Sequence, residues 1–118
     1  MPHRQEGREI GRYFSPALCA LISVRDNGSV LTRSIGSAWT LHSRKKPEVP
    51  LTEWLKHKRE TINALPTWKL AVRHLPSQDQ LVQWMTSGFS KTPTGYEVEP
   101  DGIGPDGVPS WTRLLGLV

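Results

Sequence analysis

Cysteine is almost absent from this sequence, since Cys19 is the only one among 118 residues. One cysteine excludes an internal disulfide, and the apolar neighbours of Cys19 predict a buried thiol. The four histidines are scattered at positions 3, 42, 57 and 74, so the close spacing of a zinc site is missing. We therefore expect no metal and no small-molecule cofactor, and a cytoplasmic protein.

Long hydrophobic runs are also missing. The longest apolar run, residues 17–22, is far too short to cross a bilayer. Residues 1–12 include acidic side chains and lead into no apolar segment of the length found in signal peptides. From these patterns we expect a protein without a membrane segment.

Recognisable catalytic motifs are equally scarce. One string, Gly102–Gly107, has the spacing of a glycine-rich phosphate loop, but Pro105 removes an amide donor and Asp101 and Asp106 repel phosphate. The alternating carboxylates Glu97, Glu99 and Asp101 are more typical of solvated charges at a sheet edge than of an acid/base pair. We therefore expect a protein that is not an enzyme.

Charge is abundant and unevenly distributed. Residues 1–75 carry 13 of the 15 Lys and Arg and 6 of the 11 Asp and Glu, a net charge of +7, whereas residues 76–118 carry −3. The isoelectric point near 9.6 favours a polyanionic partner. Two basic clusters stand out: Arg44, Lys45 and Lys46, and Lys56, Lys58 and Arg59.

We expect these six side chains to contact nucleic-acid backbone, because Lys and Arg that neutralise phosphates release counterions. Sequence readout is not expected, since the chain lacks a helix-turn-helix, an RNA-recognition consensus and a zinc module. The alternative is a protein–protein interaction module or inhibitor, or a homodimer. It would use exposed members of the five Trp residues together with the C-terminal segment.

The fold expected is α+β, with a small antiparallel sheet in the N-terminal half packed against two or three helices. Alternating apolar residues over 18–24 predict a strand buried on both faces. Asp26-Asn27-Gly28 predicts a hairpin turn. A three-residue loop would place Val24 opposite Val30, and a two-residue loop would place it opposite Leu31; the sequence leaves this register open. A third strand is expected over 38–43.

Residues 47–88 are expected to form helices that are separated by prolines. Thr52 is expected to cap a helix that stops before Pro66, and residues 67–75 fit either a helix or a strand. Ser77 and Gln80 form a capping box for a helix that ends at Gly88. Its buried stripe is expected to comprise Leu81, Trp84 and Met85.

The two ends of the chain are expected to contain less regular secondary structure than residues 16–88. Residues 1–15 are polar and basic and predict a flexible N-terminal arm, with residues 16–118 forming a single α+β domain. Residues 89–118 are rich in Pro and Gly and predict successive tight turns. The apolar residues between Trp111 and Leu117 are expected to dock back on the core.

Overall fold

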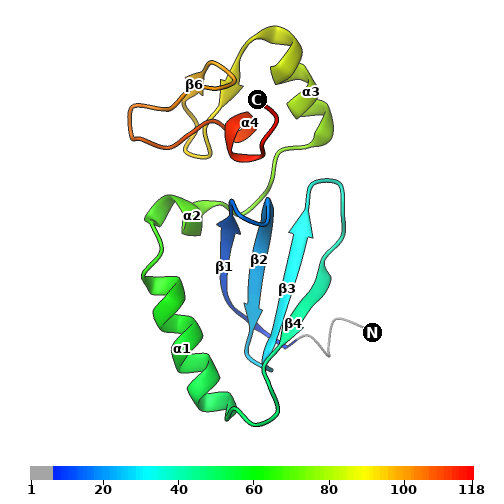
Figure 1. Cartoon of the computed structure of the whole chain (residues 1–118), viewed down its shortest axis with the longest axis vertical. Coiled ribbons are helices and arrows are strands. Elements are labelled where there is room, and N and C mark those ends of the chain that lie inside the picture. The colour runs from blue at the N-terminus through cyan, green and yellow to red at the C-terminus, as the bar shows by residue number, and fades with distance from the viewer. Residues whose placement is uncertain (1–6) are drawn as a thin grey trace.

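The computed structural model describes residues 7–118 and has an α+β fold (Figure 1). Four antiparallel strands form the main sheet in the order β1-β2-β3-β4: Glu9–Ser15, Ala20–Arg25, Ser29–Ser34 and Thr40–Arg44. The helices are α1 (Leu51–Asn63), α2 (Thr67–Ala71), α3 (Gln78–Ser87) and α4 (Trp111–Leu114). A two-stranded sheet, β5 (Ser90–Lys91) and β6 (Glu97–Val98), lies between α3 and α4. The small N-terminal antiparallel sheet and the fold class are confirmed.

The hairpin between β2 and β3 has a three-residue loop. Val24 pairs with Val30, and Gly28 lies in the left-handed region with φ of 91°. The backbone N–H of Ser29 donates to Asn27 Oδ1 at 3.1 Å. The structure thus selects one of the two registers that the sequence allowed, and every side chain of β3 is assigned to a face of the sheet by that choice.

The predicted arm at 1–15 extends too far along the chain. Residues from Glu9 to Ser15 form strand β1, which pairs with β2, and Phe14 in this strand is fully buried. Gly11 permits α1 to approach closely, because a Cβ atom there would lie 2.6 Å from Ile62 Cδ1. The remaining part of the predicted arm, residues 1–6, lies outside the described residues.

Two other local predictions differ from the structure. Cys19 lies in the turn between β1 and β2 with φ of 51°, is only partly buried, and its Sγ donates to the Pro16 carbonyl at 3.5 Å. The third strand begins at Thr40, not at position 38, because Gly36 turns the chain with φ of 75° and three unpaired residues follow. A local turn overrides the apolar alternation in both places.

The helix boundaries follow backbone chemistry. Helix α1 begins directly after Pro50, so Thr52 lies inside the helix and is not its cap. The open choice at 67–75 resolves into the short helix α2 followed by extended backbone at Val72. Helix α3 is capped as predicted: Ser77 Oγ accepts from the Gln80 N–H at 3.1 Å, and Gly88 ends the helix with φ of 79°. Met85, expected in the core, is 44% exposed.

Two apolar clusters hold the elements together. The first lies between the sheet and α1 and contains Ile22, Val24, Val30 and Ile62. The second joins one end of the sheet to the C-terminal third of the chain and contains Phe14, Leu21, Val72, Leu81, Trp84 and Trp111. The Trp111 ring meets the Phe14 ring edge-on at a centroid distance of 5.0 Å. Trp111, Leu114 and Leu115 therefore dock on the core as predicted, whereas Leu117 is 44% exposed.

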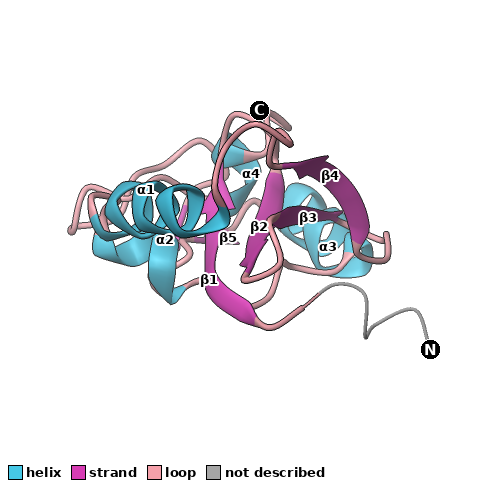
Figure 2. Cartoon of the chain, turned by 90° about the horizontal axis from the view of Figure 1, so that it is seen from below, coloured by secondary structure: helices cyan, strands magenta, loops and turns pink. Residues whose placement is uncertain are grey.

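The molecule is elongated, measuring 50 × 31 × 18 Å. The main sheet, α1 and α2 occupy one end of the long axis, and α3, β5, β6 and α4 occupy the other (Figure 1). Seen along the long axis, α1 and α2 lie on the same side of the sheet, next to β1 (Figure 2).

Asp106 links the C-terminal turns to one another through hydrogen bonds. Its carboxylate accepts from Thr94 Oγ1 at 2.7 Å and from the Val108 N–H at 3.2 Å. The hydrogen bond from Thr94 holds the pKa of Asp106 below its usual value. This carboxylate therefore has a structural role within the turns.

Candidate nucleic-acid interface

The charge asymmetry of the sequence becomes an asymmetry along the long axis. Residues 7–75, here called the basic end, build the main sheet, α1 and α2. Residues 76–118, the acidic end, build the rest. Within the described part of the chain, the ion pairs are those of Glu9 with Arg12 at 2.9 Å and with Arg73 at 3.3 Å. The other Lys and Arg side chains of the basic end are therefore not neutralised by ion pairs among these residues.

The first predicted cluster lies where β4 leads into the loop before α1. Arg44 ends β4, and both Arg44 and Lys46 are exposed. Lys45 is partly buried because its N–H donates to the Gly28 carbonyl at 2.7 Å and its side chain packs over that glycine. The structure thus leaves two of the three cations accessible.

The second predicted cluster is divided by the geometry of α1. Residues two apart on a helix point about 200° away from each other, so Lys56 and Lys58 project to opposite sides. Lys58 is partly buried, and its Nζ lies 5.5 Å from the centre of the Trp54 ring. Lys56 and Arg59 are exposed on a surface that also carries Glu53 and Glu60. Within the second cluster, Lys58 therefore lies on a different side of α1 from Lys56 and Arg59.

A basic feature that the sequence analysis missed lies on the main sheet. Residues directly opposite each other in neighbouring strands share a face of a sheet. Val24 is opposite Val30, so the residues that flank the hairpin loop, Arg25 and Ser29, both point to the other face of the sheet. Ser29 is also opposite Arg44, so Arg25 and Arg44 lie on one face. Ser23 lies two residues before Arg25, on the same face, and is opposite Arg12 and Leu31. Arg33 lies two residues after Leu31 and therefore also belongs to this face. We call this surface the arginine face: Arg12, Arg25, Arg33 and Arg44.

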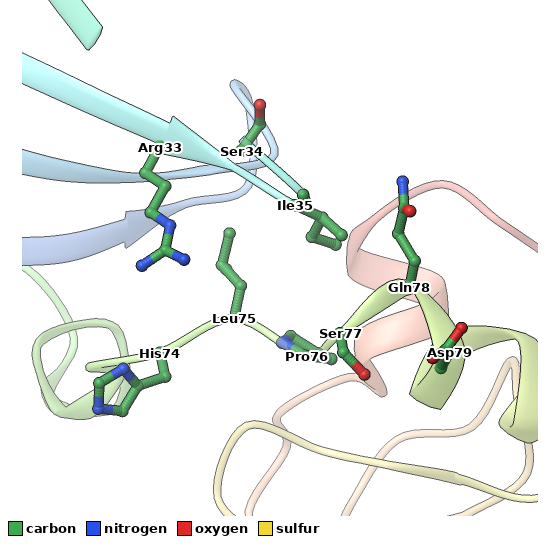
Figure 3. A pocket seen from close by; sticks show the side chains of 10 residues that line it. Arg33, Ser34, Ile35, His74, Leu75, Pro76, Ser77, Gln78 and Asp79 are labelled. Atoms are coloured by element: carbon green, nitrogen blue, oxygen red, sulfur yellow. The ribbon is translucent and has the colours of Figure 1, made fainter. Parts of the chain in front are cut away.

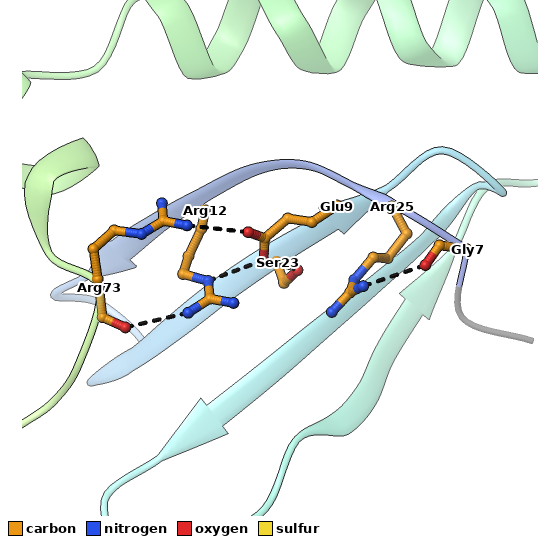
Figure 4. A network of polar contacts seen from close by, with 6 residues as sticks. All are labelled: Gly7, Glu9, Arg12, Ser23, Arg25 and Arg73. Atoms are coloured by element: carbon orange, nitrogen blue, oxygen red, sulfur yellow. Dashed lines mark hydrogen bonds and ion pairs between the residues drawn. The ribbon is translucent and has the colours of Figure 1, made fainter. Parts of the chain in front are cut away.

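Two members of the arginine face, Arg12 and Arg25, donate hydrogen bonds within the network drawn in Figure 4. Arg12 Nε donates to Glu9, and Arg12 Nη1 donates to the Arg73 carbonyl at 3.2 Å. Arg25 is partly buried and donates from Nη1 to the Gly7 carbonyl at 3.3 Å. Arg33 and Arg44 are exposed, so these two guanidinium groups are the ones available to an external anion.

Glu9 is the acidic centre of the network in Figure 4. Partial burial raises the pKa of its carboxyl group, but hydrogen bonds from Ser23 and Arg12 and the positive charges of Arg12 and Arg73 outweigh that effect. The net result is a pKa below the usual value, so Glu9 is ionised and positions Arg12 on the sheet.

All five Trp side chains are buried or partly buried, which corrects the expectation of exposed tryptophans. Trp84 and Trp111 are buried, and Trp39, Trp54 and Trp68 are partly buried against the two apolar clusters. The large exposed apolar side chains of the C-terminal third are other residue types, including Val82, Met85, Phe89, Tyr96 and Leu117.

A cavity of about 420 Å³ lies where the arginine face meets the acidic end (Figure 3). Arg33 and His74 line one side, and Gln78 and Asp79 at the start of α3 line the other. Arg33 Nε donates to the Ser37 carbonyl at 3.0 Å, which fixes the guanidinium at the cavity rim. Both signs of charge line the cavity, so it marks the boundary between the two ends.

Residues 7–118 contain no group of three or more His, Cys, Asp or Glu side chains placed to hold a metal ion. In the same residues, no helix combines the length and the apolar character of a membrane span. No protein-family model matches the chain, and neither does any curated protein or solved structure.

Proposed function

We propose that this protein is a non-enzymatic nucleic-acid-binding protein that contacts the phosphate backbone through its basic end, without reading sequence. The observation that carries the proposal is the segregation of charge along the long axis, with the positive end largely free of compensating ion pairs among the described residues. A surface of this kind gains binding free energy by releasing counterions from phosphates.

The available cations divide into two groups. Arg33 and Arg44 belong to the arginine face, with Lys46 just beyond the end of β4. Lys56 and Arg59 belong to the outer side of α1. Guanidinium groups bind phosphate oxygens in a bidentate manner, which favours the arginine face as the principal contact. The acidic end repels phosphate and therefore orients the molecule on approach.

The test is fluorescence anisotropy of labelled DNA and RNA at about 50 and 200 mM salt, where a backbone binder loses orders of magnitude in affinity. Arg44→Glu is expected to weaken binding by at least about tenfold at the lower salt concentration. Lys91→Glu, the matched control, makes the same charge change on an exposed residue of the acidic end and is expected to have little effect. Absence of binding at the lower salt concentration, or equal effects of the two variants, overturns the proposal.

A second candidate function, protein–protein interaction, is favoured by an apolar groove on the acidic end. The groove has a volume of about 600 Å³ between α3 and the residues after α4, and Val82 and Met85 on its wall are 62% and 44% exposed. Asp79 is the charged residue of its lining. Charge complementarity with this end therefore favours a basic amphipathic helix as the occupant.

The groove is tested with a synthetic helical peptide that carries Leu at positions i, i+3, i+4 and i+7 and Lys elsewhere. Val82→Ser is expected to abolish peptide binding, whereas Leu18→Ser, a similarly exposed leucine of the basic end, is expected to leave it unchanged. Equal binding by both variants refutes the groove. Self-association that Val82→Ser disrupts identifies a second copy as the occupant and refutes the basic helix.

A further inference from the structure

The aromatic rings of the basic end are buried or partly buried. Proteins that bind single strands combine a positively charged groove with accessible aromatic faces. In the basic end, Phe14 is fully buried, and Tyr13, Trp39, Trp54 and Trp68 are each partly buried. Stacking therefore depends on whether one ring face of a partly buried aromatic remains open.

Each partly buried tryptophan carries a cation above its ring. The Arg12 guanidinium carbon lies 5.1 Å from the centre of the Trp39 ring, and Lys58 Nζ lies 5.5 Å from that of Trp54. Lys69 Nζ lies 5.8 Å from the centre of the Trp68 ring. All three rings also pack against the apolar clusters, so a base could stack only by displacing a cation.

At Trp39 that displacement is opposed by further contacts. The cation above this ring, Arg12, is also ion-paired with Glu9 at 2.9 Å and hydrogen-bonded to the Arg73 carbonyl at 3.2 Å. The strongly exposed aromatic side chains, Phe89 and Tyr96, lie in the acidic end, where phosphates are repelled. Cations and accessible aromatic rings are therefore at opposite ends of the molecule.

We infer that the target of the basic end is double-stranded nucleic acid, not single strands; this inference rests on the proposed function. A duplex keeps its bases stacked internally and presents phosphates at about one charge per 1.7 Å of axis. An exposed guanidinium surface without stacking platforms matches that target. The arginine face supplies the contacts, and the capped tryptophans exclude the contribution that base stacking makes to single-strand binding.

The test compares duplexes of about 20 base pairs, two helical turns, with one of their own strands, as DNA and as RNA. The strand is chosen without self-complementarity, and binding is followed by anisotropy and by intrinsic tryptophan fluorescence. We expect at least about tenfold tighter binding of the duplex, with unchanged tryptophan fluorescence. Equal or tighter binding of the single strand overturns the inference and leaves backbone binding intact. Binding of neither overturns the proposed function as well.

A matched pair of variants on α1 tests whether the cation above the Trp54 ring blocks base stacking. Lys58→Gln removes the cation above Trp54, and Lys56→Gln removes an equal charge from the other side of the same helix. The ratio of duplex to single-strand affinity is expected to fall at least about threefold in Lys58→Gln and to stay constant in Lys56→Gln. Identical ratios in the two variants would show that the cation does not block stacking.

Discussion

The edge-on contact between Phe14 and Trp111 makes a quantitative prediction about how the two ends of the molecule are joined. Phe14 belongs to β1 of the main sheet, and Trp111 begins α4 at the other end. They are 0% and 7% exposed, and their ring centres lie 5.0 Å apart with planes at 79°. This geometry brings the positive edge of one ring to the negative face of the other.

A double-mutant cycle measures the contact. Phe14→Leu and Trp111→Leu are each expected to lower the free energy of unfolding by about 1–3 kcal/mol, since each loses part of a buried ring but keeps an apolar side chain. Such an aromatic pair contributes about 0.5–1.5 kcal/mol beyond burial, and this is the expected coupling energy. Leucine is used because alanine at either position would cost about 3–5 kcal/mol, a large part of the stability of a domain this size.

The assay is urea unfolding followed by far-ultraviolet circular dichroism and by tryptophan fluorescence. Because the cluster around Phe14 and Trp111 draws residues from both ends, the two probes are expected to report one coincident transition. The control cycle combines Phe14→Leu with Val82→Ala, an exposed position outside the apolar clusters, and should be additive within about 0.5 kcal/mol. A coupling energy of zero, or two separate transitions, refutes the shared core.

Substitutions at three further positions test local features. Gly28→Val should destabilise the protein by at least about 1–2 kcal/mol in urea unfolding, since φ is 91° and the new Cβ would lie 2.9 Å from Lys45 Cγ; unchanged stability contradicts the hairpin geometry. Ser77→Ala should cost about 1 kcal/mol by removing the cap of α3, and Ser77→Asp should restore it. Glu9→Gln should lower stability by about 1 kcal/mol at pH 7. Because the pKa of Glu9 is depressed by folding, the difference from wild type should shrink as pH falls below the ordinary value of 4.5, and a difference that persists in acid argues against the network.

Local signals predicted the features that depend on neighbouring residues. The turn at Asp26-Asn27-Gly28 and the cap at Ser77 need only a few residues of sequence, because positive φ and side-chain capping are local constraints. Strand β1 was missed because its order comes from pairing with β2 and from the approach of Ile62 to Gly11, contacts made with distant parts of the chain. A glycine-containing, charged segment has no local pattern that reveals such partners.

The candidate interface was predicted only in part, for a related reason. Runs of Lys and Arg are visible in the sequence, but the helix period separates Lys56 from Lys58, and packing over Trp54 partly buries Lys58. The arginine face was missed because its four members come from four strands and share a face only through the sheet register. Once the three-residue hairpin loop is known, the pairing of β2 with β3 alone places Arg25 and Arg33 on one face.

Whether the arginine face contacts phosphates is measured by the salt dependence of duplex binding. The proteins compared are wild type, Arg33→Gln, Arg44→Gln and the control Lys91→Gln. Each phosphate contact contributes about 0.9 to the slope of log affinity against log salt concentration. Each arginine substitution is expected to lower the magnitude of the slope by about that amount, and the control is expected to leave it unchanged. Wild-type slopes retained by both arginine variants would contradict the assignment of backbone binding to the arginine face.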